Sequence, residues 1–294
     1  MKARCKQDAL FDFINFLYII AMIVIFAFPL IFIFCASISD QNAVWQGKVW
    51  LWPVGPSFAG YKRIFEYKDI WLGYRNTIVY TLSGTLLNVI MTICAAYPIS
   101  RKDFKAGPAL TTFYLATMFF NAGIIPNYLL IKSLGLLDSF WVMILPGAVG
   151  VWNVIVTRTF FRSNIPNELR EAAAIDGCSN FRLLIKIILP LSSAILAILT
   201  LFYGVSHWNA YFNALLYLKT RTRFPLQLIL REILIINTSL IDPESLSGSA
   251  SERQTIVESI KYGVIIVSSL PLLIAYPFVQ KHFVKGIMVG SLKG

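Results

Sequence analysis

The chain has 294 residues, of which 57% are hydrophobic and 14% are charged. Soluble globular domains carry about 25% charged residues, so this composition excludes an ordinary soluble protein and indicates that the bilayer surrounds much of the chain. The net charge of +11 would suit a nucleic-acid partner, but no basic stripe with interleaved aromatic residues stands apart from the apolar runs. Lys and Arg residues that flank membrane segments explain the charge better, and no nucleic acid is expected.

Six stretches without Asp, Glu, Lys or Arg reach the roughly 18 residues that a helix needs to cross the hydrocarbon core. They are residues 13–39, 76–100, 106–131, 139–157, 187–218 and 262–280. Six crossings place both chain ends on the same side, so the sequence predicts an all-α membrane protein with six transmembrane helices. The stretch 187–218 is longer than one crossing needs, and its first residues are expected to belong to the polar segment before it.

The first stretch could be a secretory signal, because Lys2, Arg4 and Lys6 precede it. It is far longer than the ~7–15 residues of a signal core. Cys35 follows Phe34 rather than a small residue, which argues against a lipoprotein cleavage site. We interpret the stretch as a retained first membrane helix.

A polar, charged segment lies between the fourth and fifth stretches. Pro166 fits the first turn of a short helix with Asn164 as its cap, and Gly177 can take the positive φ that ends a helix. A second helix then enters the next apolar run. The first helix has a small, smooth surface with little side-chain bulk, which suits docking into a groove of another protein. This surface is formed by Leu169, Ala172, Ala173 and Ile175.

The same segment reads E-A-A, three residues, G, nine residues, I-x-L-P, from Glu171 to Pro190. This pattern resembles the coupling-loop signature of permease subunits of binding-protein-dependent ABC importers. The resemblance implies a type I ABC importer permease fold with a cytosolic coupling helix, which sits in a cleft of the ATPase subunit and transmits closure of the ATP-bound dimer. The implied ATPase-coupling residues are Glu171, Ala172, Ala173, Gly177 and Leu169.

Further stretches are similar to the carbohydrate branch of this family, so the resemblance covers nearly the whole chain. They are residues 75–77 with 80–81, 125–128, 134–139, 207–212 and 283–294. The C-terminal stretch resembles that of lipoprotein- and polygalacturonan-type permeases, and its Lys-Gly end resembles the smaller maltose permease subunit, whose tail reaches between the ATPase subunits. The resemblance implies ATPase contacts for Lys285, Gly290, Lys293 and Gly294.

The resemblance also implies the compartment and the partners. The chain is expected in the bacterial cytoplasmic (inner) membrane with both termini cytosolic, alongside a homologous second permease subunit, two ATPase subunits, an extracytoplasmic substrate-binding protein and membrane lipid. It is expected to be non-catalytic and to bind no metal or cofactor, since ATP and Mg are bound by the ATPase subunits. The sequence itself contains no G-x-x-x-x-G-K-S/T phosphate loop. Lys and Arg divide almost evenly between the two sides, so the orientation depends on the coupling motif, which must face the ATPase.

The predicted organisation follows from these assignments. It comprises a cytosolic N-terminus (1–12), a first transmembrane helix (13–39), an outer loop (40–75), a core of five transmembrane helices (76–280) with the coupling loop 163–186 and the outer loop 219–261, and a cytosolic tail (281–294). In the second outer loop, residues 224–236 are predicted to form a packed helix and residues 237–251 a polar excursion that faces the binding protein.

Polar and aromatic residues inside an apolar run usually face a bundle interior or an aqueous cavity. Asn209 and Asn213 are four residues apart and are expected on one helix face. Trp and Tyr rings could stack on a sugar. The alternative is that these polar and aromatic side chains form hydrogen bonds between helices, as they often do in membrane proteins. The candidate translocation-path residues are Trp208, Asn209, Tyr211, Asn213 and Asn121.

The leading interpretation is an ATP-driven oligosaccharide importer. Basic residues in the outer loops could steer an acidic, alginate- or pectin-like substrate, or could meet lipid headgroups or the binding protein instead. They are Lys48, Lys62, Arg63, Lys68, Arg221 and Arg223. One alternative is an importer of the same architecture for an amino acid or phosphonate. An ion-coupled secondary transporter is disfavoured, because no Asp or Glu lies within the six stretches.

Overall fold

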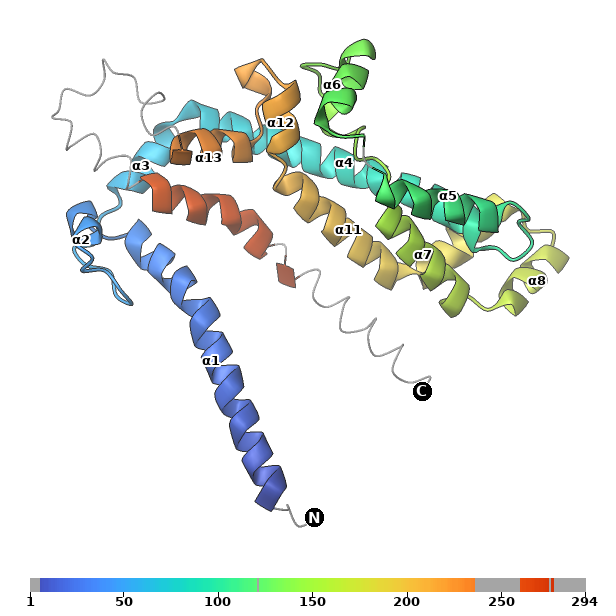
Figure 1. The fold of residues 1–294 in the computed structure, drawn as a ribbon, viewed down its shortest axis with the longest axis horizontal. Helices are drawn as coiled ribbons and strands as arrows, with labels where there is room; N and C mark the ends of the chain where they lie inside the picture. The colour runs from blue at the N-terminus through green and yellow to red at the C-terminus, as the bar shows by residue number, and fades with distance from the viewer. Residues whose placement is uncertain (1–5, 121, 236–259, 275, 278–294) are drawn as a thin grey trace. The chain divides into compact units, whose positions relative to one another are not determined.

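The computed structural model describes residues 6–120, 122–235, 260–274 and 276–277, which form helices joined by turns, with no strand in these ranges (Figure 1). The α-helices are α1 (Lys6–Ser37), α2 (Gln41–Trp45), α3 (Ala59–Glu66), α4 (Lys68–Ser100), α5 (Gly107–Phe119), α6 (Ile124–Ser133), α7 (Val151–Asn164), α8 (Asn167–Ile175), α9 (Asn180–Leu183), α10 (Leu189–Leu191), α11 (Ser193–Trp208), α12 (Phe212–Tyr217) and α13 (Leu226–Ile235). A further helix covers Ile260–Ile274. The chain forms two compact units, residues 1–68 with 230–270 and residues 69–229 with 271–294.

In the first unit, the end of α1 packs on the loop that follows it. Cys35 shares a small buried cluster with Ala43 and Val49. The Tyr61 hydroxyl of α3 donates to Ser37 Oγ at 2.8 Å. Most of α1 exposes large apolar side chains, as expected of a helix whose neighbours are lipid or other membrane chains.

Among the described residues, two single helices are long and apolar enough to span a membrane, Leu10–Ser37 and Lys68–Ser100. Two bent helix pairs would each add one span if both halves are counted together, Gly107–Phe119 with Ile124–Ser133 and Asn180–Leu191 with Ser193–Trp208. The two single helices correspond to the first two predicted stretches. α4 begins at Lys68 rather than at residue 76, so the prediction placed its start too late. A charge-free window misses polar residues that extend a helix beyond the hydrocarbon core, and Asp69 in the first turn of α4 is favoured there by the helix dipole.

The predicted third and fourth crossings are not continuous helices. The third stretch is divided between α5 and α6, and Gly123 before α6 has φ 84° and ψ 175°, a conformation that essentially only glycine adopts. In the fourth stretch α7 begins only at Val151, because Pro146 and two glycines interrupt the apolar run. Counting apolar length ignored these backbone effects.

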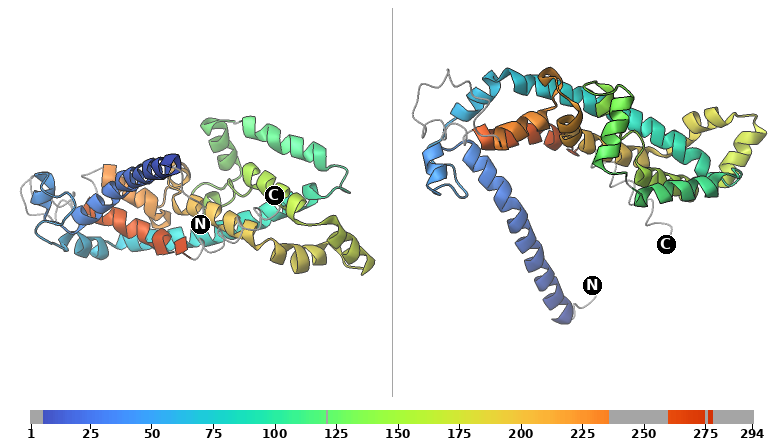
Figure 2. Two further views of the ribbon diagram at one scale, coloured as in Figure 1. Left: turned by 90° about the horizontal axis from the view of Figure 1, so that it is seen from below. Right: turned by 45° about the horizontal axis from the view of Figure 1, so that its top comes forward.

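The core of the second unit lies among α4, α7 and α11, which run close to one another (Figures 1 and 2). Ala96, Val154, Phe161 and Leu199 are buried in it. Polar contacts also join the elements, since the Tyr203 hydroxyl lies 2.7 Å from Thr92 Oγ1 and accepts from the Gly150 N–H at 3.2 Å. Hydrogen bonds of this kind satisfy polar groups inside the membrane, where no water is available to do so.

Gly84 of α4 lies directly against the side chain of His207 in α11. A Cβ at this position would overlap the imidazole of His207, so Gly84→Ala is expected to lower the free energy of unfolding by about 1–3 kcal/mol. Thermal unfolding of the purified protein measures this loss. The control is Gly147→Ala, whose added Cβ meets nothing within 4 Å, and the double variant Gly84→Ala/His207→Ala should recover stability. Equal melting temperatures for the two glycine variants would contradict the close approach.

Candidate functional site: the coupling loop and the outer clamp

The helix α8 lies at the end of the second unit away from α12 (Figures 1 and 2). It begins at Asn167, with Pro166 as its N-cap at φ −59° and ψ 143°. The prediction that Asn164 caps the helix was wrong, because Asn164 is the last residue of α7 and its Nδ2 donates to the Phe160 carbonyl at 3.2 Å. A residue before proline is driven out of the α region, so Ile165 is extended and α7 stops there.

The predicted glycine turn is confirmed. Gly177 has φ +68°, its N–H donates to the Ala174 carbonyl at 3.1 Å, and the Cys178 N–H donates to the Ala173 carbonyl at 2.9 Å. These two bonds form a Schellman motif, which satisfies the last carbonyls of α8. Ser179 then caps α9, because its Oγ accepts from the Arg182 N–H. The turn therefore fixes the orientation of α9 relative to α8.

The predicted smooth surface of α8 is divided between two faces. Ala173 is buried at 5% exposure in the core of the second unit, and Leu169 and Cys178 pack against the same core. The other face is open to solvent, and Ile175 is 87% exposed. The exposed residues of this face are Glu171, Ala172, Ala174 and Ile175. Leu169 and Ala173 thus hold α8 to its own chain, whereas the remaining residues are accessible to a partner.

The I-x-L-P end of the motif forms a sharp bend into the next long helix. Residues Leu184–Ile188 are π-helical, and the axis of residues 180–191 makes an angle of 83° with α11. Pro190 lacks the N–H that would continue the α-helical ladder, and a wider π-turn accommodates this loss. The first residues of the fifth stretch therefore belong to the coupling segment, as expected.

Charged side chains connect this loop to the end of α4. Arg101 forms a double hydrogen bond with the Asp103 carboxylate, with Nε donating to Oδ1 at 2.8 Å, and a further hydrogen bond from its guanidinium to Asn180 Oδ1 in α9. The bond from Arg101 holds the pKa of Asp103 below its usual value. Burial lowers the pKa of Arg170 in α8. Sequence reasoning missed these contacts.

The predicted path residues are placed differently from expectation. α11 ends at Trp208, which is buried, and Asn209 is its C-cap residue, with Nδ2 donating to the Val205 carbonyl at 2.9 Å. Asn213 lies in the separate helix α12, so the prediction that Asn209 and Asn213 share one helix face was wrong. The side chain of Asn209 bonds to the last turn of α11, and the helix stops at this position. Tyr211 is exposed, and Asn121 lies outside the described residues.

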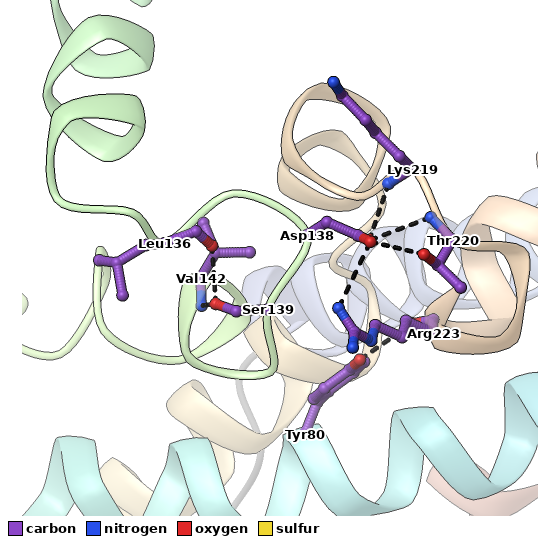
Figure 3. A network of polar contacts seen from close by, with 8 residues as sticks. All are labelled: Tyr80, Leu136, Asp138, Ser139, Val142, Lys219, Thr220 and Arg223. Atoms are coloured by element: carbon purple, nitrogen blue, oxygen red, sulfur yellow. Dashed lines mark hydrogen bonds and ion pairs between the residues drawn. The ribbon is translucent and has the colours of Figure 1, made fainter.

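A second polar cluster ties the segment after α12 to the turn before the Trp141–Met143 helix (Figure 3). Asp138 has φ 51° and its Oδ1 accepts from the backbone N–H groups of Lys219 and Thr220, both at 3.0 Å. Its Oδ2 accepts from the Thr220 hydroxyl and pairs with Arg223 Nη1 at 3.4 Å. We call these four residues the Asp138 cluster.

The first turns of α4 also bind the segment that follows α12. Asn76 Nδ2 donates to the carbonyls of Thr222 and Phe224 at 2.8 and 3.0 Å. The Tyr80 hydroxyl donates to the Arg223 carbonyl at 2.9 Å, and Thr77 Oγ1 accepts from the N–H of the first residue of α13 at 2.8 Å. Asn76, Thr77, Tyr80 and Asp138 lie in the stretches 75–77, 80–81 and 134–139. These stretches are similar to the carbohydrate branch of the family, but the sequence alone assigned them no function. Their role here is to fix the segment between α12 and α13.

Two basic residues proposed to steer a substrate are already paired. Arg221 Nε donates to Asp69 at 2.6 Å, and Arg223 pairs with Asp138. The predicted helical part of the outer loop is confirmed as α13. The polar excursion 237–251 and the tail residues Lys285, Gly290, Lys293 and Gly294 lie outside the described residues.

These features define a helical membrane protein that presents a short helix, half anchored and half accessible, beside its membrane helices. Residues 70–289 match the family model of the binding-protein-dependent transport system inner membrane component, and the chain belongs to this family. It is therefore a transport subunit of the permease type and an inner membrane component.

Two relatives from Bacillus subtilis align with nearly the whole chain. The chain is 38% identical over 288 residues to the polygalacturonan/rhamnogalacturonan transport system permease protein YtcP of Bacillus subtilis, covering 98% of this chain and 100% of the relative. It is 36% identical over 290 residues to protein LplC of the same organism, covering 98% and 97%.

A solved structure confirms the fold. A chain from a bacterial ABC transporter involved in the import of the acidic polysaccharide alginate superimposes with a TM-score of 0.88 at 33% identity, covering 96% of this chain and 100% of that chain. The protein therefore has the all-helical type I ABC permease fold.

Proposed function

We propose that this chain is a transmembrane subunit of an ATP-driven importer for an oligosaccharide delivered by an external binding protein. It crosses the membrane six times with both termini in the cytosol, and it pairs with a homologous permease subunit and two ATPase subunits. The chain itself is non-catalytic, and ATP with Mg binds to the ATPase subunits. The observation that carries this proposal is the geometry of α8 in a chain of this family, since one face is anchored in the core and the other is open to a partner.

The mechanism follows from that geometry. ATP binding closes the ATPase dimer and displaces the docked α8. Because Leu169 and Ala173 pack into the core with Phe161 and Leu199, the displacement is passed to α7 and α11 rather than absorbed by a loose loop. The membrane helices then change between inward- and outward-facing states, which differ in their affinity for the binding protein and for nucleotide, as a ligand-driven switch requires.

An acidic oligosaccharide is the proposed substrate class. Support comes from the names of two similar proteins, one from a polygalacturonan/rhamnogalacturonan transport system and one from a transporter involved in the import of alginate. The basic side chains of Lys48, Lys62 and Lys68 are exposed and are available to attract a polyanion. Arg221 and Arg223 contribute less, because carboxylates of the chain already neutralise them.

The substrate is identified by titration calorimetry on the binding protein that works with this permease, because that protein selects the solute. The panel contains oligogalacturonates, alginate oligosaccharides, neutral oligosaccharides of the same length, an amino acid and a phosphonate. The expected result is heat of binding only with the uronate oligomers. Binding of neutral sugars alone would reject the acidic substrate class, and binding of the amino acid or phosphonate alone would reject the carbohydrate assignment.

A further inference from the structure

The end of α4 and the start of α9 are connected by one side chain. Arg101 directly follows α4, and its guanidinium bonds to Asn180, the first residue of α9, although 79 positions separate the two in the sequence. Asp103 holds the guanidinium from the side with two hydrogen bonds. Arg can serve both partners because its donors lie in a rigid planar fork, which a Lys ammonium does not provide.

The Arg101 guanidinium also contacts an aromatic ring of α4. Its carbon lies 6.0 Å from the centre of the Tyr97 ring, within the range of a cation–π contact. Tyr97 is buried and packs edge-on against Phe161 of α7 at 6.4 Å between ring centres. The Arg101 side chain is only 21% exposed. It is therefore held in place by α4 and α7 before it reaches α9.

α4 is itself fixed at its other end. Its first turns bind the segment 222–226 through Asn76, Thr77 and Tyr80. The helix has 33 residues, which corresponds to about 50 Å. One continuous helix thus connects the coupling loop at one end with the segment between α12 and α13 at the other.

We propose that Arg101 is a positioning residue for transport, which pins the coupling loop to α4 so that displacement of α8 and α9 also moves α4. This inference rests on the proposed role of α8 as the ATPase-docking helix. In this proposal Arg101 acts through Asn180 and not through the ATPase. It carries the displacement from α9 to α4, in parallel with the packing of Leu169 and Ala173 on α7 and α11.

The test uses the complete transporter in nanodiscs and measures ATP hydrolysis with and without loaded binding protein. Arg101→Ala and Asn180→Ala are each expected to reduce the stimulation ratio about three- to tenfold, within the range found for residues that carry coupling. The double variant should lose no more than the single variants, since both remove the same contact. Asn180→Asp should keep the stimulation when Arg101 is present, because a carboxylate accepts from Arg, and should restore nothing in Arg101→Ala.

Lys102→Ala is the matched control, since it removes a basic side chain that is exposed in the same loop and should leave the ratio unchanged. Wild-type stimulation in Arg101→Ala, or additive losses in the double variant, would overturn the proposal. If Arg101→Ala does not assemble, Asn180→Ala and Asn180→Asp still test the proposal. Asn180 is exposed, so its replacement is expected to leave the fold intact. A wild-type complex that its loaded binding protein does not stimulate would instead contradict the proposed function.

Discussion

Replacing Gly177 by proline is expected to abolish stimulation of ATP hydrolysis by the loaded binding protein. Gly177 has φ +68° and donates its N–H to the Ala174 carbonyl. Proline has no N–H and holds φ near −65°, so the Schellman motif cannot form and α8 loses its orientation relative to α9. The measurement is the hydrolysis rate of the assembled transporter with and without loaded binding protein, and the expected loss is at least tenfold, or about 1.4 kcal/mol of coupling.

The matched variant is Gly177→Asn. Asparagine tolerates the left-handed conformation better than other non-glycine residues, and a Cβ at this position meets nothing within 4 Å. This variant should retain most of the stimulation. Full stimulation in Gly177→Pro, in a complex that contains normal amounts of the ATPase subunits, would remove the role proposed for the loop.

The second large effect is expected at Asp138. Asp138→Ala removes three hydrogen bonds and the ion pair to Arg223, and it places alanine at φ 51°. The free energy of unfolding should fall by about 1–3 kcal/mol, measured by thermal unfolding of the purified protein. Asp138→Asn keeps a residue that tolerates this φ and should lose less. An unchanged melting temperature for Asp138→Ala would show that the Asp138 cluster does not stabilise the fold.

The pH dependence gives an independent check on the same residue. Hydrogen bonds from Thr220, first from its hydroxyl and then from its N–H, lower the pKa of Asp138 from 3.8 to about 2. Because the pKa is lower in the folded state, the stabilisation is fully present above pH 4 and is lost as the pH falls through 2. The difference in melting temperature between wild type and Asp138→Asn should therefore shrink between pH 4 and pH 2. A difference that stays constant over this range would contradict the proposed origin of the stability.

The outer loop shows how far composition can predict structure. The apolar part of the loop 219–261 was predicted to be helical, and α13 occupies Leu226–Ile235. The same compositional reasoning failed for the stretch 139–157, where a proline and two glycines override the apolar run. It also failed at Asn209, where α11 ends, so that Asn213 lies in a separate helix. Apolar content predicts burial in the membrane, whereas backbone conformation decides where each helix stops.

The sequence by itself determined the family, the polar loop and the helix-ending turn at Gly177. These depend on composition and on local backbone sterics, which neighbouring residues encode. Only the tertiary structure decided that Ala173 faces the core, that Arg101 reaches Asn180, and that Asp138 binds Thr220 at a separation of 82 positions. Such contacts arise because folded helices bring distant segments together, and a single sequence holds no local signal for which polar side chains will then meet.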